Sequence, residues 1–117
     1  MGIIKQEIKV IGEKAEDKDL AVVDNGTDRT MIKESLLNRI GAKYVGKVDV
    51  VLREEVKTKK NVYVVDLELG KCKIPKIVVI GGNANLIGRD ILQITDAKLD
   101  FKNDKVDFPN YPIEIRI

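Results

Sequence analysis

The feature that most constrains the fold of this chain is a succession of short strand-like runs with turn signals between them. Within the runs, Ile and Val alternate with polar residues or form brief apolar stretches, as in β-strands. Many short strands in a chain of 117 residues favour one compact, mostly-β barrel or sandwich, so we expect a single domain over residues 1–117. The expected strands cover residues 3–11, 20–24, 45–52, 61–69, 73–80, 97–101, 105–108 and 112–117.

Two short helices interrupt the strands. The segment 32–40 places Ile32, Leu36, Leu37 and Ile40 on one helical face, and Gly41 follows as a C-terminal cap. The segment 89–94 follows Gly88 and is long enough for one or two turns. The charged segment 13–19 is expected to form a loop, and Pro75 favours an edge or the start of a strand.

Composition excludes several kinds of chemistry. The chain has no His, which removes Ser-His and Cys-His catalysis and the commonest metal ligand. Its single Cys72 cannot form an internal disulfide or a zinc cluster, and it is interpreted as a packing residue. Any catalysis must therefore use carboxylates, Lys, Tyr, Ser or Thr, and we expect no metal and no cofactor.

The charges are numerous but balanced. Charged residues make up 34% of the chain and leave a net charge of +2, which does not suggest a nucleic-acid partner. The short basic run at 57–60 is interpreted as a solvated loop. No apolar run is as long as a membrane span and the N-terminus has no signal-peptide pattern, so we expect a cytoplasmic protein without a membrane partner. Abundant Lys, Glu, Ile and Val with few aromatic residues are typical of heat-adapted proteins.

The sequence VVDNGTDRT, at 22–30, has two interpretations. Asn25-Gly26 between strand-like flanks is a strong signal for a two-residue hairpin turn. Alternatively, an Asp followed by Gly and Thr on a tight turn is how an aspartic protease presents its catalytic carboxylate. The second interpretation makes Asp24 the catalytic residue.

A second motif favours the catalytic interpretation. In NANLIGRDIL, at 83–92, the apolar pair Leu86-Ile87 precedes Gly88, and Arg89-Asp90 open a short helix. Both motifs occur in the order and at roughly the spacing found in the retroviral-type aspartic proteases. Over residues 20–102 the chain therefore resembles the retropepsin-like family, whereas the hairpin interpretation explains nothing at 86–92.

The resemblance implies a fold, an assembly and a chemistry. It implies a compact closed β-barrel with one or two short helices that is active as a symmetric homodimer, with one Asp24 from each copy at the two-fold axis. Asn25, Gly26 and Thr27 would support the catalytic turn, and Asp28 would pair with Arg89 to hold that turn to the helix. The implied activity is an aspartic endopeptidase in which two carboxylates share one proton and activate a water.

The resemblance also implies how substrate and partner bind. A flap hairpin would close over an extended peptide or unfolded protein substrate; its tip lies within 52–60 and is assigned to Leu52, Arg53, Glu54, Glu55, Val56 and Lys57. The C-terminal run PIEIRI alternates strictly, and its apolar face is expected to pair with a second copy through Ile113, Ile115 and Ile117.

Asn25 departs from the family pattern, in which Thr or Ser bonds across the dimer axis at this position. Two alternatives to a protease therefore stay open. One is a protein of this fold that binds extended peptides and cleaves them poorly or not at all. The other is an unrelated β-barrel interaction or nucleic-acid module that uses the basic run at 57–60.

Overall fold

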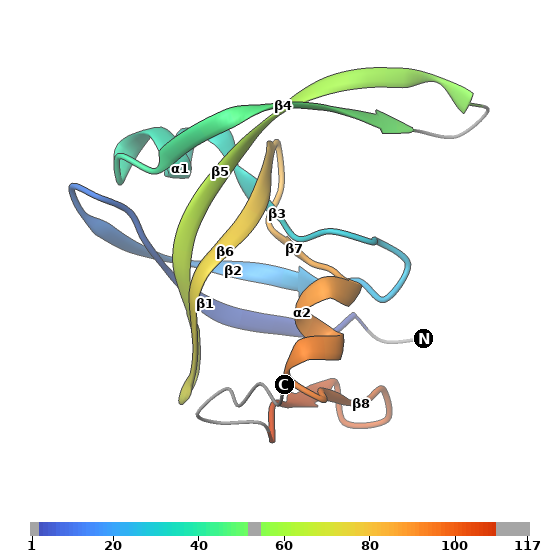
Figure 1. Ribbon diagram of the computed structural model, residues 1–117. Coiled ribbons are helices and arrows are strands. Elements are labelled where there is room, and N and C mark those ends of the chain that lie inside the picture. The colour runs from blue at the N-terminus through green and yellow to red at the C-terminus, as the bar shows by residue number, and fades with distance from the viewer. Residues whose placement is uncertain (1–2, 52–54, 110–117) are drawn as a thin grey trace, which may run out of the picture.

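The computed structural model describes residues 3–51 and 55–109, and within them the chain forms nine β-strands and two short helices (Figure 1). The helices are α1, Glu34–Arg39, and α2, Arg89–Ile94. The strands are β1 Lys5–Ile11, β2 Glu16–Val23, β3 Met31–Lys33, β4 Lys43–Val51, β5 Lys57–Leu69, β6 Cys72–Gly82, β7 Leu86–Ile87, β8 Lys98–Asp100 and β9 Lys105–Asp107.

Strand pairing closes the main sheet on itself. Its order is β1-β2-β7-β3-β6-β5-β4, and β1 also pairs with β5 through the register Val10↔Leu67. Six strands therefore form a hydrogen-bonded ring, and β4 extends it by pairing with β5. A separate two-stranded sheet of β8 and β9 lies below α2 in Figure 1. The expected mostly-β fold with two short helices is confirmed.

The ring encloses an apolar core. Alternate residues of β1, such as Ile8 and Val10, are buried while their neighbours are not, because successive side chains of a strand point to opposite faces. Cys72 is part of this core, as its interpretation as a packing residue predicts, and burial raises the pKa of its thiol. The largest fully buried side chains include Ile4, Ile8, Ile32, Leu36, Leu37, Ile40, Leu67, Leu69, Ile87 and Ile91.

Helix α1 is capped by a glycine. After α1, Gly41 adopts a φ of 66°, and the N–H groups of Gly41 and Ala42 donate to the carbonyls of Asn38 and Leu37. This pair of bonds is a Schellman cap, and it confirms the role expected for Gly41. The helix begins later than expected, because Ile32 lies in β3 and pairs with β6.

The charged segment at 13–19 is not the expected loop. β2 begins at Glu16, which is paired with Ile11 of β1, so the turn is limited to residues between these two strands. Asp17 and Asp19 occupy alternate positions on the face of β2 that carries Ala21 and Val23. Their carboxylates are paired with Arg39 and Lys33, and these pairings make charged residues compatible with that face of the strand.

The segment around Pro75 interrupts the pairing of β5 with β6. The register shifts opposite Pro75, Lys76 adopts a φ of 52°, and its N–H donates to the carboxylate of Asp66. Pro has no N–H to donate to a strand ladder, and at a bulge no such donor is needed. Pro75 therefore lies at a bulge and not at the start of a strand.

Several expected site residues lie outside the described ranges. These are Leu52, Arg53 and Glu54 of the flap tip and Ile113, Ile115 and Ile117 of the proposed dimer strand. Within the described ranges, no helix is both long and apolar enough to cross a membrane.

Candidate active site

Asp24 is the first residue after β2, and the pairing around it is not that of a hairpin. β7 lies between β2 and β3 and runs parallel to β2, with Val23 opposite Ile87. The N–H of Asp24 donates to the carbonyl of Ile87 at 2.9 Å. Neither Asn25 nor Gly26 has the positive φ that the expected hairpin turn needs, so the hairpin interpretation of this segment is wrong.

The carboxylate of Asp24 is held by its own turn. The N–H of Gly26 donates to Oδ1 at 2.9 Å, and the hydroxyl of Thr27 donates to Oδ2 at 2.8 Å. The N–H of Thr27 also donates to the Asp24 carbonyl at 3.2 Å. Each carboxylate oxygen thus has a donor, which fixes the plane of a half-buried group.

The two residues after Asp24 are exposed. A Cβ on Gly26 would lie 3.2 Å from Asp24 Oδ1 and meets no other atom within 4 Å. Asn25 is exposed on the same turn. The side of the turn that carries Asn25 and Gly26 is therefore open to solvent in this chain.

The second sequence motif packs directly against this turn. The N–H groups of Arg89 and Asp90 donate to the carbonyls of Thr27 and Asp28, at 2.8 and 3.2 Å. The Arg89 guanidinium forms an ion pair with the Asp28 carboxylate, the pairing that the resemblance implies. The Asp24 turn and α2 are thus joined by backbone and side-chain contacts.

Gly88 is required by the closeness of that packing. A Cβ at this position would lie 2.7 Å from the carbonyl carbon of Arg29 and 2.8 Å from the oxygen of Thr27. Real Cβ atoms do not approach backbone this closely. The Gly of the second motif therefore lets α2 contact the turn.

Thr30 is a site residue that sequence reasoning missed. It is fully buried, and its hydroxyl donates to Asp90 Oδ1 at 2.8 Å and accepts from the N–H of Gly88 at 3.1 Å. Its own N–H donates to the Asp90 carboxylate. A Thr before an apolar run carries no sequence signal for this role, because the partners lie about 60 positions away.

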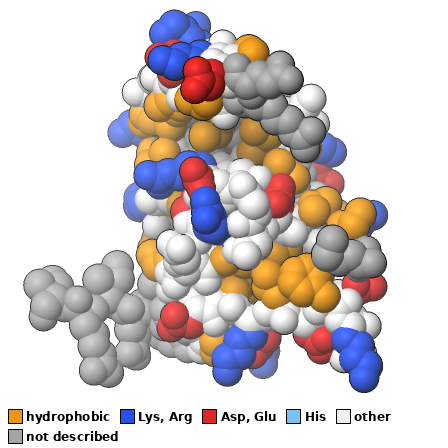
Figure 2. Space-filling model, turned by 90° about the vertical axis from the view of Figure 1, so that its right-hand side faces the viewer, with side chains coloured by type: hydrophobic (Ala, Val, Ile, Leu, Met, Phe, Trp, Pro, Cys, Tyr) orange, Lys and Arg blue, Asp and Glu red, His pale blue; other side chains and the backbone are white. Residues whose placement is uncertain are grey.

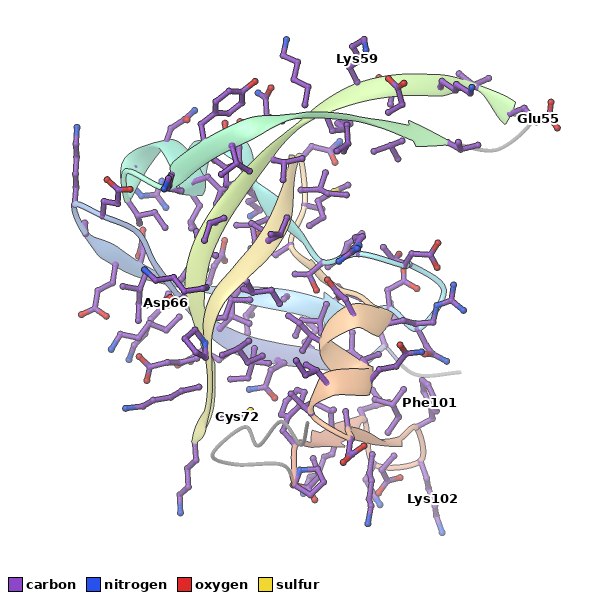
Figure 3. The ribbon with its side chains drawn as sticks, viewed as in Figure 1. Glu55, Lys59, Asp66, Cys72, Phe101 and Lys102 are labelled. Atoms are coloured by element: carbon purple, nitrogen blue, oxygen red, sulfur yellow. The ribbon has the colours of Figure 1, made fainter. Side chains whose placement is uncertain are left out.

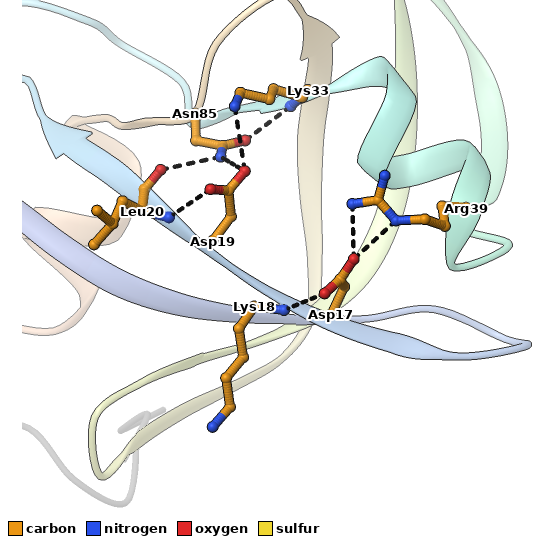
Figure 4. Close-up of polar contacts among 7 residues, drawn as sticks. All are labelled: Asp17, Lys18, Asp19, Leu20, Lys33, Arg39 and Asn85. Atoms are coloured by element: carbon orange, nitrogen blue, oxygen red, sulfur yellow. Dashed lines mark hydrogen bonds and ion pairs between the residues drawn. The ribbon is translucent and has the colours of Figure 1, made fainter.

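Asn85 is a second residue that the sequence did not indicate. Its side chain is buried between β2 and β3, accepts from the N–H of Lys33 at 2.9 Å and donates to Asp19 Oδ2 at 2.8 Å and to the Leu20 carbonyl at 3.1 Å (Figure 4). The N–H of Leu20, the Asn85 amide and the Lys33 ammonium lower the pKa of Asp19. This network joins the strands on either side of β7, which leads to Gly88.

A groove of about 740 Å³ lies between the Asp24 turn and the hairpin of β4 and β5 (Figure 2). Its charged lining residues are Asp28, Arg29 and Asp49, and Gly26 and Thr27 form the edge nearest Asp24. The walls are otherwise apolar, formed by Met31, Val48, Val50, Val51, Val62, Val78, Ile80 and Leu86. Such a mixture of apolar walls and a few polar groups is typical of binding sites.

The hairpin above the groove contains the segment in which the flap tip is expected. Val51 of β4 is opposite Lys57 of β5, and Glu55 between them has a φ of 61°. Glu55 lies at the outer end of the hairpin and Lys59 on its outer side (Figure 3), while Val56 is exposed. The basic run at 57–60 is part of β5 and not a loop, because it pairs with β4 in a two-stranded extension beyond the ring.

The comparisons with known proteins relate the fold to proteases. No family model matches the chain, and no curated protein matches it. Among solved structures, an EIAV protease complexed with the inhibitor HBY-793 has a TM-score of 0.67 at 17% identity, over 85% of this chain and 93% of that one. At this identity the likeness concerns the fold, so the chain has a mostly-β fold similar to that of a retropepsin.

Proposed function

We propose that this protein is an aspartic endopeptidase that acts as a symmetric homodimer, with Asp24 of each copy as the catalytic residue. The observation that carries the proposal is the Asp24 carboxylate, which is held by Gly26 and Thr27, two residues that line the groove beneath the β4–β5 hairpin. The fold that surrounds it is similar to that of a viral protease.

The dimer is needed because peptide hydrolysis by this route uses two carboxylates. Two like charges about 4 Å apart repel by about 4 kcal/mol at an effective dielectric constant near 20. At about 1.36 kcal/mol per pKa unit, this repulsion separates the two apparent pKa values by about 3 units. The pair therefore holds one proton over a broad acidic range, and these pKa values belong to the pair.

The shared proton gives the two carboxylates different roles. The ionised one accepts a proton from a water that attacks the peptide carbonyl carbon, and the protonated one donates a hydrogen bond to the carbonyl oxygen. The donors from Gly26 and Thr27 hold the carboxylate plane before substrate arrives. An extended peptide would lie in the groove with alternate side chains against its apolar walls.

Cleavage of an unfolded protein between pH 3 and 7 tests this function. The wild type should cleave at mildly acidic pH, and Asp24→Asn should not. Asp104→Asn is the matched control, because Asp104 lies in the exposed β8–β9 turn with a φ of 51°, which Asn tolerates. Cleavage that survives in Asp24→Asn would rule out this mechanism.

Subunit mixing tests the dimer separately. If both carboxylates of a dyad are needed, adding excess Asp24→Asn chain to wild type should suppress cleavage as mixed dimers form. Sedimentation should show the dimer in both proteins. Activity that is unaffected by the excess would show that each copy works alone.

A second candidate function is binding of extended peptides without turnover, and Asn25 favours it. Its amide is longer than the hydroxyl of the Thr or Ser expected at this place, and it is exposed beside Asp24. A displacement of about 1 Å in a catalytic turn costs on the order of 100-fold in rate. If the wild type binds peptides without cleaving them, Asn25→Thr should restore cleavage.

A further inference from the structure

Among the described residues that line the groove, Arg29 is the one cation. It lies on the exposed part of the turn that follows Asp28, and it lines the groove together with Met31 and Leu86. A long cationic side chain at the edge of a largely apolar groove is placed to contact whatever binds there.

The other charges of the lining already have partners. Asp28 is paired with Arg89, and Asp49 is paired with Lys59 at 3.2 Å. The Arg29 guanidinium makes no hydrogen bond or ion pair within the part of the chain that the structure describes. Among the described lining residues, Arg29 therefore carries the one charge that is not paired with a charge of opposite sign.

We propose that Arg29 is a specificity-determining residue that binds an acidic side chain of an extended peptide. This inference rests on the proposed function only in that the groove must accept such peptides. A guanidinium presents donors in a planar fork that matches a carboxylate, and apolar walls strengthen the pairing relative to open water.

The apolar walls of the groove indicate which other residues the bound peptide should carry. Successive side chains of an extended peptide point to opposite sides, so residues on either side of the acidic one face away from Arg29. The residues two positions along return to the same side of the peptide as the acidic one, and the groove walls available to them are mainly aliphatic, with Val78 and Ile80 among the lining residues. The favoured peptide therefore combines one Glu or Asp with aliphatic residues two positions away.

Binding to the Asp24→Asn chain tests this proposal without requiring cleavage. Fluorescent peptides of Val and Ala carry Glu, Gln or Lys at one position, which is moved along the sequence. At one position Glu should bind about 5-fold more tightly than Gln, and Lys more weakly than Gln, with the difference shrinking as salt is raised.

Charge reversal supplies the decisive comparison. In the Asp24→Asn background, Arg29→Glu should favour Lys over Glu at that position. Lys71→Glu makes the same change in net charge in the β5–β6 turn, which does not line the groove, and should keep the preference for Glu.

Three outcomes overturn the inference: equal binding of the three peptides at every position, a preference for Glu that survives in Arg29→Glu, or no binding of any peptide. Cleavage by the active chain without a charge preference would leave the proposed function intact while removing this role of Arg29. Binding with the expected preference but no cleavage by the wild type would support this role of Arg29 and contradict the proposed endopeptidase activity.

Discussion

Asp28 and Arg89 lie 61 positions apart in the chain, and their ion pair joins the turn that presents Asp24 to the first turn of α2. The side chains are 79% and 48% exposed, so the pair contributes little to the free energy of folding. Its effect is local, because it constrains the segment between Thr27 and Thr30.

Arg89→Gln should therefore separate stability from activity. We expect a loss of less than about 1 kcal/mol in the free energy of unfolding, because the pair is exposed. The rate of cleavage at saturating substrate should fall by about tenfold, because the turn is held less rigidly. Arg39→Gln breaks another exposed pair, with Asp17, and should leave that rate unchanged. An unchanged rate in Arg89→Gln would contradict the positioning role.

The two glycines of the site should respond differently to Ala. Gly88→Ala forces a Cβ against backbone atoms at 2.7 and 2.8 Å, so we expect a loss of about 1–3 kcal/mol or more in stability. In Gly26→Ala the new Cβ meets only the Asp24 carboxylate, at 3.2 Å. That variant should lose activity with a smaller change in stability. Chemical denaturation of both proteins measures the difference, and equal losses would contradict this account.

Thr30→Val should destabilise the fold by about 1–3 kcal/mol. It leaves the buried N–H of Gly88 and an oxygen of Asp90 without the hydroxyl that they bond. Thr95→Val is the matched control: Thr95 is equally buried, but its hydroxyl donates to an Ile91 carbonyl that also accepts the N–H of Thr95. The control should lose less, as thermal or chemical unfolding would show.

Acid unfolding should depend on the two carboxylates of β2. The hydrogen bond from Arg39 lowers the pKa of Asp17, and that from the N–H of Leu20 lowers the pKa of Asp19, both from 3.8 (Figure 4). The unfolded chain therefore binds these protons first as pH falls, so the stability they contribute is present above about pH 4 and lost below it. Asp17→Asn with Asp19→Asn should flatten this part of the pH–stability curve. An unchanged slope would contradict the assignment.

Tyr63 should make the stability of the fold depend on pH in the alkaline range. Burial, reinforced by the hydrogen bond from its hydroxyl to Glu34 Oε2 at 2.7 Å, raises its pKa from 10.0 to about 12. Because the folded state keeps this proton longer than the unfolded one, stability should fall as pH rises from about 10 to 12. Tyr63→Phe should remove that slope, and Tyr44→Phe, at an exposed position, should keep it. Unfolding measured across this range with each protein provides the comparison.

Local features of the site could be predicted from the sequence because their partners are neighbours. The donors to Asp24 come from two and three positions along the chain, and Gly41 caps the helix that it directly follows. The resemblance to the retropepsin-like family also implied that Asp28 beside this turn would pair with Arg89, as it does. Alternation of apolar residues was sufficient to predict a mostly-β fold, and apolar residues at helical spacing predicted α1.

Contacts between residues far apart in the chain could not be predicted from local sequence patterns. Thr30 meets Asp90 across 60 positions and Asn85 meets Asp19 across 66, so neither contact has a signature at one place in the chain. The extension of β2 to Glu16 depends on Arg39 and Lys33 reaching its acidic residues from other elements.

What the sequence determined by itself is the strand periodicity, the Asp24 turn with its local donors, and the motif that packs against it. The tertiary structure alone decided that β7 lies between β2 and β3, which rules out the hairpin, and that the β4–β5 hairpin covers an apolar groove containing Arg29. The physical reason is that turn hydrogen bonds form within a few residues, whereas strand order and groove walls depend on contacts between segments that the chain brings together only on folding.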